Sequence, residues 1–111
     1  MLVVEDSALI ALDLECALQD LGVARVTLAP DPARAFAALG DGDVSAALVD
    51  VFLDREDGLA VARELKTLGI PFALMTGLGD ARGLQAQFPG TPILPKPFSG
   101  LDLIDIVECL C

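Results

Sequence analysis

Short apolar runs alternate with longer mixed segments along the whole chain. The apolar runs lack the polar alternation of a half-exposed strand, so they predict strands that are covered on both faces. The mixed segments carry apolar residues at helical spacing and predict helices. Strands are expected at residues 2–4, 25–28, 46–49, 72–75 and 93–94, and helices at 7–21, 31–39, 58–68, 80–87 and 99–110.

Five strand–helix repeats in 111 residues predict one α/β domain that spans 1–111, with no output domain attached. We expect a doubly wound, five-stranded parallel sheet of flavodoxin-like (βα)5 topology, with strand order 2-1-3-4-5. Helix ends support these boundaries. Asp31 and Ser99 stand where N-caps are needed, and Gly22, Gly40 and Gly69 stand where C-caps are needed.

Polar residues follow four of the five predicted strands. In the order 2-1-3-4-5, strands 1 and 3 are neighbours, and the functional crevice lies beyond their carboxyl ends. Glu5, Asp6 and Asp50 should therefore converge in one pocket, with Thr76 and Lys96 along its far side.

The chemistry of this predicted pocket suits phosphoryl transfer. Three neighbouring carboxylates repel each other unless a cation neutralises them, and an oxygen-only ligand set suits Mg²⁺. A carboxylate beside Mg²⁺ can accept a phosphoryl group. A threonine hydroxyl and a lysine ammonium would balance the transferred charge, so we expect Asp50 to be the acceptor.

Each of these residues also has a simpler explanation when it is taken alone. Asp6 could be a helix N-cap, and Asp50 could stabilise the turn after its strand. Thr76 could belong to an ordinary loop, and Lys96 to the solvated surface. Their joint position at the ends of strands 1, 3, 4 and 5 favours a shared site.

Composition excludes several other classes of protein. Seventeen acids against seven scattered bases give a net charge of −10, which argues against nucleic-acid binding. No apolar stretch is long enough to span a membrane, and no signal peptide is visible. Histidine is absent, and Cys16, Cys109 and Cys111 lack metal-ligand spacing. We expect reduced thiols in a cytoplasmic protein.

Five short motifs together resemble the receiver domain of two-component response regulators, over essentially the whole chain. They are L-V-V-E-D-S (2–7), A-L-V-D-V (47–51), D-G (57–58), A-L-M-T-G (73–77) and L-P-K-P-F (94–98). The resemblance implies that Asp50 accepts a phosphoryl group from a phosphohistidine on a sensor histidine kinase. It implies that Asp6 ligates Mg²⁺ directly, with Glu5 assisting and the backbone carbonyl of Phe52 completing the ligand set.

The same resemblance implies that Thr76 and Lys96 contact the phosphoryl group. Ile93 departs from the family, because receivers of the common kind carry an aromatic switch residue at this position. The P-F-x-x-x-T-G stretch at 71–77 resembles a subgroup of stand-alone receivers that lack this switch and are partnered by kinases of the HWE type.

Such a receiver would be a signalling protein that catalyses its own phosphorylation and dephosphorylation, not an enzyme acting on other substrates. We expect slow dephosphorylation, because Phe52 and Leu78 are apolar and would position no attacking water. Output would pass to a downstream protein partner or a phosphotransfer protein. The alternative is a phosphate-independent interaction module. A Mg²⁺-dependent hydrolase of the haloacid dehalogenase kind would need D-x-D, which D-V-F-L-D at 50–54 does not supply.

Two helices offer candidate contact surfaces. In the first, one apolar stripe should face the core, and a second stripe predicts an exposed patch of the kind with which receivers dock against the kinase. The last helix could pack fully or pair with a second copy of the chain. The core stripe comprises Ile10, Leu14, Ala17, Leu18 and Leu21, and the exposed stripe comprises Leu9, Leu12 and Cys16.

Overall fold

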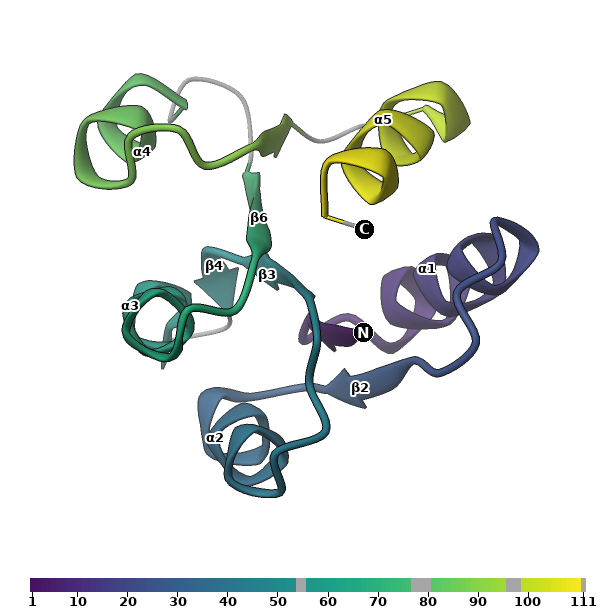
Figure 1. The fold of residues 1–111 in the computed structure, drawn as a ribbon, viewed down its shortest axis with the longest axis horizontal. Helices are drawn as coiled ribbons and strands as arrows, with labels where there is room; N and C mark the ends of the chain where they lie inside the picture. The colour runs from purple at the N-terminus through teal and green to yellow at the C-terminus, as the bar shows by residue number, and fades with distance from the viewer. Residues whose placement is uncertain (54–55, 77–80, 96–98, 111) are drawn as a thin grey trace.

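Five parallel strands form the central sheet of the computed structural model, which describes residues 1–53, 56–76, 81–95 and 99–110. The strands are β1 (Leu2–Val4), β2 (Thr27–Ala29), β3 (Ala47–Asp50), β6 (Phe72–Thr76) and β7 (Ile93–Pro95). Their order is β2-β1-β3-β6-β7 (Figure 1). This is the predicted order 2-1-3-4-5, so the predicted fold class is confirmed.

Helices cover both faces of the sheet. Helices α1 (Ala8–Asp20) and α5 (Gly100–Leu110) lie on one face, on the right of Figure 1. Helices α2 (Pro32–Gly40), α3 (Gly58–Leu68) and α4 (Ala81–Gln87) lie on the other. None of these described helices has both the length and the apolar character to cross a membrane.

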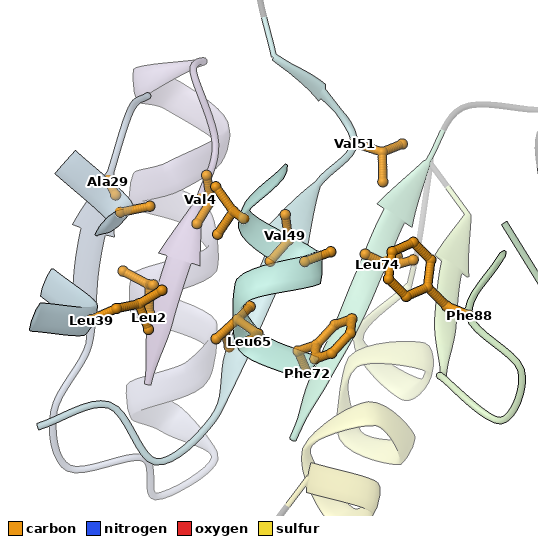
Figure 2. Close-up of a cluster of buried hydrophobic side chains, with 14 of the residues drawn as sticks. Leu2, Val4, Ala29, Leu39, Val49, Val51, Leu65, Phe72, Leu74 and Phe88 are labelled. Carbon is orange, nitrogen blue, oxygen red and sulfur yellow. The ribbon is translucent and has the colours of Figure 1, made fainter. Parts of the chain in front are cut away.

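The strands divide their side chains between two apolar clusters because successive residues of a strand point to opposite faces. Leu2, Val4 and Val49 join the cluster under α2, α3 and α4, which Figure 2 shows. Val3 and Leu48 join the cluster under α1 and α5. All five side chains are fully buried. The lack of polar alternation in the apolar runs therefore corresponds to a sheet covered on both sides.

Side-chain caps begin three of the helices. Ser7 Oγ accepts the Ile10 N–H of α1 at 3.5 Å, and Asp31 Oδ1 accepts the Arg34 N–H of α2 at 2.8 Å. Ser99 and Asp102 cap α5 reciprocally, because each backbone N–H donates to the other's side chain, at 2.9 and 3.2 Å. The N-cap predictions for Asp31 and Ser99 are confirmed.

Glycines with positive φ follow two helices as predicted. Gly22 has φ of +95° and Gly69 has φ of +72°, the left-handed region in which a side chain is strained. The prediction for Gly40 is wrong, because α2 continues through Gly40 and Asp41 is still right-handed. The positive φ falls on Gly42 instead, at +81°.

The core face of α1 is rotated from the predicted stripe. Ala11, Leu14 and Leu18 are the buried residues of this helix. The core assignments of Ile10 and Leu21 are wrong, since these side chains are 36% and 37% exposed. Ile10 lies in the first turn and Leu21 is the C-cap, so both lie at the ends of the helix.

The predicted outer stripe of α1 is confirmed: Leu9, Leu12 and Cys16 are all exposed. The last helix buries only one face, formed by Leu103, Ile106 and Leu110, so it is not packed on all sides.

Two other details differ from the sequence prediction. Strand β2 begins at Thr27 and not at Arg25, whose carbonyl accepts a hydrogen bond from the N-terminal ammonium at 2.6 Å. A small antiparallel hairpin, β4 (Phe52–Leu53) with β5 (Glu56–Asp57), was not predicted. Strands of two residues are too short to show a period in the sequence.

Gly83 and Gly69 provide a matched test of the helix geometry. Gly83 lies within α4 with ordinary φ and open space around a new Cβ, whereas Gly69 has positive φ. Gly83→Ala should raise the free energy of unfolding by up to about 1 kcal/mol, and Gly69→Ala should lower it by about 1 kcal/mol or more. Urea denaturation measures both, and equal effects of the two substitutions would contradict the geometry.

Candidate functional site

Three carboxylates meet at the carboxyl edge of the sheet. The side-chain oxygens of Glu5, Asp6 and Asp50 offer ligand atoms that all lie within 4.8 Å of one another. Glu5 directly follows β1 and its N–H donates to the carbonyl of Ala29 at 3.1 Å, whereas Asp50 is the last residue of β3. Since β1 and β3 pair in parallel, their ends bring these acids together, as the sequence predicted.

The three acids differ in their exposure to solvent. Glu5 and Asp50 are only 3% and 4% exposed, whereas Asp6 is exposed. Glu5 Oε1 accepts the backbone N–H of Ser7 at 3.2 Å, and this contact ties it to the start of α1. The cluster therefore has two buried carboxylates and one carboxylate at its opening.

This donor set fits a hard divalent cation. Two buried carboxylates so close together are mutually repulsive, and a bound cation removes the repulsion. The ligands are oxygens alone, which Mg²⁺ prefers, and the exposed position of Asp6 leaves room for the waters that Mg²⁺ retains. The residues present thus fit the magnesium site that the sequence predicted.

Thr76 ends β6, the strand next to β3, and is fully buried. Asp50 pairs in register with Met75, whose carbonyl accepts the N–H of Val51 at 3.1 Å. Thr76 therefore lies one residue beyond the partner of Asp50 along the same edge. Its own register partner is Pro95 of β7.

Other predicted site residues are described less completely. Phe52 begins β4 directly after Val51, and its side chain is outside the described part of the chain. Lys96 and Leu78 lie outside the described residues altogether. Ile93, which replaces the aromatic switch, begins β7 and is partly buried against the cluster under α2, α3 and α4.

Gly58 belongs to the site although the sequence analysis gave it no role. It is the first residue of α3, and a Cβ there would collide with the carbonyl oxygen of Asp50 and approach the Cα of Val51 to 3.1 Å. Only glycine lets α3 begin against the backbone of Asp50. The D-G pair at 57–58 was the sequence feature from which this role could have been inferred.

Comparison with known proteins yields one family over nearly the whole chain. The family described as "Response regulator receiver domain" matches residues 1–108. The chain is also similar to Protein PetR of Rhodobacter capsulatus, with 34% identity over 84 residues. This match covers 71% of the chain and 35% of PetR, so the chain spans about a third of that relative's length.

Solved structures give the same result. SdrG from Sphingomonas melonis Fr1 has 35% identity and a TM-score of 0.83, with 98% of this chain and 92% of that chain covered. A response regulator receiver protein from Sinorhizobium medicae has 29% identity and a TM-score of 0.85, with 98% and 90% covered.

A methyl group at position 58 should disturb the backbone of Asp50. Gly58→Ala is expected to lower the free energy of unfolding by about 1–3 kcal/mol, because the new Cβ overlaps the Asp50 carbonyl. Gly100→Ala is the matched control, since Gly100 also begins a helix and has nothing within 4 Å of its new Cβ. Urea denaturation of both variants gives the comparison, and a neutral Gly58→Ala would refute the close packing.

Proposed function

Because the chain belongs to the response regulator receiver family, we propose that Asp50 accepts a phosphoryl group from a phosphohistidine of a sensor histidine kinase. The observation that supports this most is the convergence of Glu5, Asp6 and Asp50, whose ligand atoms lie within 4.8 Å of one another. The acceptor is Asp50 because it ends the central strand β3 and is flanked by both neighbouring strands.

In the proposed reaction, a carboxylate oxygen of Asp50 attacks the phosphorus atom. The phosphorus–nitrogen bond breaks and its electron pair stays with the imidazole nitrogen of the kinase. The protein contributes mainly position and counter-charge to such a transfer. The backbone of Asp50 is held from both sides, by the β6 pairing and by the contact with Gly58.

Residues around the acceptor would hold the metal and the transferred group. Asp6 and Asp50 would ligate Mg²⁺, with Glu5 assisting and the carbonyl of Phe52 completing the protein ligands. When bound, Mg²⁺ supplies positive charge to the oxygens of the transferring group. The Thr76 hydroxyl would donate to a phosphoryl oxygen.

Phosphorylation adds about −1.5 to −2 charges to this acidic edge. We assign the lysine at position 96 to this charge, because it directly follows Pro95, the register partner of Thr76. Its ammonium would form an ion pair with the phosphoryl oxygens.

Output from this receiver would differ from the common aromatic switch. Ile93 occupies the switch position, and the chain contains no tyrosine. We therefore propose that phosphorylation alters contacts with a downstream protein or a phosphotransfer protein without rotation of an aromatic ring at position 93. The subgroup resemblance of residues 71–77 supports an HWE-type kinase as the proposed donor. The free cysteines Cys16 and Cys109 support the cytoplasm as the proposed compartment.

Acetyl phosphate provides a direct test of phosphorylation. With Mg²⁺ present, the wild-type protein should show a retarded band on a Phos-tag gel, and Asp50→Asn should abolish that band. Asp13→Asn is the matched control, because Asp13 is an exposed acid outside the cluster. A retarded band that survives Asp50→Asn would contradict the assignment, and the lack of any band would favour the phosphate-independent interaction module.

Magnesium should stabilise the folded chain, because it binds only where the three acids are assembled. Ligand at 100 times its dissociation constant adds about 2.7 kcal/mol to the free energy of unfolding. Scanning calorimetry with Mg²⁺ and with EDTA should show a higher Tm in Mg²⁺ for the wild type and for Asp13→Asn. Asp6→Asn should lose most of this increase, and an unchanged increase would remove Asp6 from the ligand set.

A further inference from the structure

A cavity of about 500 Å³ lies at the amino edge of the sheet, at the end of the domain away from the three carboxylates. It is found where β6 and β7 begin and where α3 and α5 end. Strand β6 runs from Phe72, in the cavity wall, to Thr76 at the carboxylate edge. Small-molecule pockets usually have volumes of about 300–1,000 Å³. The cavity is therefore large enough for a small ligand and separate from the proposed phosphorylation site.

Most of the cavity wall is apolar. Phe72 and Leu110 are buried, and the ring of Phe72 packs edge-on against the buried ring of Phe88. The two ring centroids are 5.9 Å apart and the ring planes meet at 86°. This part of the wall is held in place by the core, and it would cover the apolar part of a ligand. The apolar lining residues are Ile70, Pro71, Phe72, Pro92 and Leu110.

Among the described residues that line the cavity, Lys66 alone is charged. Its Nζ lies 6.0 Å from the centroid of the Phe88 ring, whose face attracts the ammonium. No carboxylate in the described part of the chain forms an ion pair with Lys66. The cavity thus presents a positive charge beside an apolar wall, in a chain whose net charge is −10.

Lys66 also lies in the last turn of α3, where a cation stabilises the carbonyl end of a helix. Backbone hydrogen bonds already occupy carbonyls at this end. The Gly69 N–H donates to the Lys66 carbonyl at 3.2 Å, and the Ile70 N–H donates to the Leu65 carbonyl at 3.0 Å. These carbonyls do not need the ammonium as a donor, so it can pair with an anion in the cavity.

We propose that this cavity binds a small apolar carboxylate, whose body packs against Phe72 and Leu110 and whose carboxylate forms an ion pair with Lys66. An apolar wall with one cation suits this class of ligand better than a nucleotide, whose phosphates would need more donors. The site goes beyond the proposed function, because it uses none of the residues at the carboxylate edge.

An NMR titration with two matched probes tests the proposal. The probes are naphthaleneacetate and naphthaleneacetamide, which have nearly the same shape but differ in charge. The anion should shift the amide signals of Ile70, Thr91 and Leu110, which line the cavity. It should bind about tenfold more tightly than the amide, because only the anion forms a charged pair. Equal affinities, or no shifts at millimolar probe, would overturn the proposal.

Two substitutions that remove the same charge identify the cation. Lys66→Gln should weaken the binding of naphthaleneacetate about tenfold. Arg63→Gln should leave it unchanged, because Arg63 is an exposed cation of the same helix that does not line the cavity. Equal weakening by the two substitutions would reduce the binding to general attraction of an anion and would overturn the proposal.

The exposed thiols provide a second measurement in the same molecule. Cys109 lines the cavity, whereas Cys16 lies on α1 and does not. In a Cys111→Ser protein, naphthaleneacetate should slow the alkylation of Cys109 by iodoacetamide and leave that of Cys16 unchanged. Equal rates for Cys109 with and without the probe would overturn the proposal.

The Asp50→Asn protein separates this site from the proposed phosphorylation. It should give the same probe-induced shifts as the wild type, whether or not the wild type accepts a phosphoryl group. Shifts that are lost in Asp50→Asn would place the probe at the carboxylate edge and would overturn the proposal.

Discussion

The parallel pairing of β1 with β3 brings together side chains that repel each other. Glu5 follows one of these strands and Asp50 ends the other, and both carboxylates are almost fully buried. Burying two like charges side by side is unfavourable, so the rest of the structure must hold them there. It does so with apolar clusters on both faces of the sheet, and with the Ser7 N–H that donates to Glu5. The closeness of these carboxylate oxygens is what makes this edge suited to a hard divalent cation.

Much of this arrangement could be predicted from the sequence, because parallel strands that are buried on both faces appear in it as unbroken apolar runs. Once the runs were ordered, the topology placed Glu5, Asp6 and Asp50 at one edge. The rotation of α1 was harder to predict than the strand order, because apolar residues occupy most of the circumference of this helix. Whether Ala11 or Ile10 faces the core depends on how α1 is placed and rotated against the sheet. The β4–β5 hairpin and the close packing at Gly58 both arise where one backbone segment approaches another. The spacing of apolar and polar side chains along the sequence does not indicate such an approach.

The helices on the two faces of the sheet differ in the sign of their net charge. All lysines and arginines of the described helices lie in the layer of α2, α3 and α4, while α1 and α5 carry acids only. Along the chain the two acidic helices stand first and last, with the three helices that carry the bases between them. The fold brings the first and the last helix together on one face of the sheet. Helices α1 and α5 hold six of the seventeen acids of the chain and none of its seven bases.

Gly58 carries a mechanical consequence. The backbone of α3 begins so close to the Asp50 carbonyl that no methyl group fits between them. Because there is no clearance between them, Asp50 and the first turn of α3 cannot move independently. A displacement of Asp50 toward α3 must move that helix or be resisted by the apolar cluster beneath it. Asp50 is thus coupled mechanically to the first turn of α3, in the helical layer opposite α1 and α5.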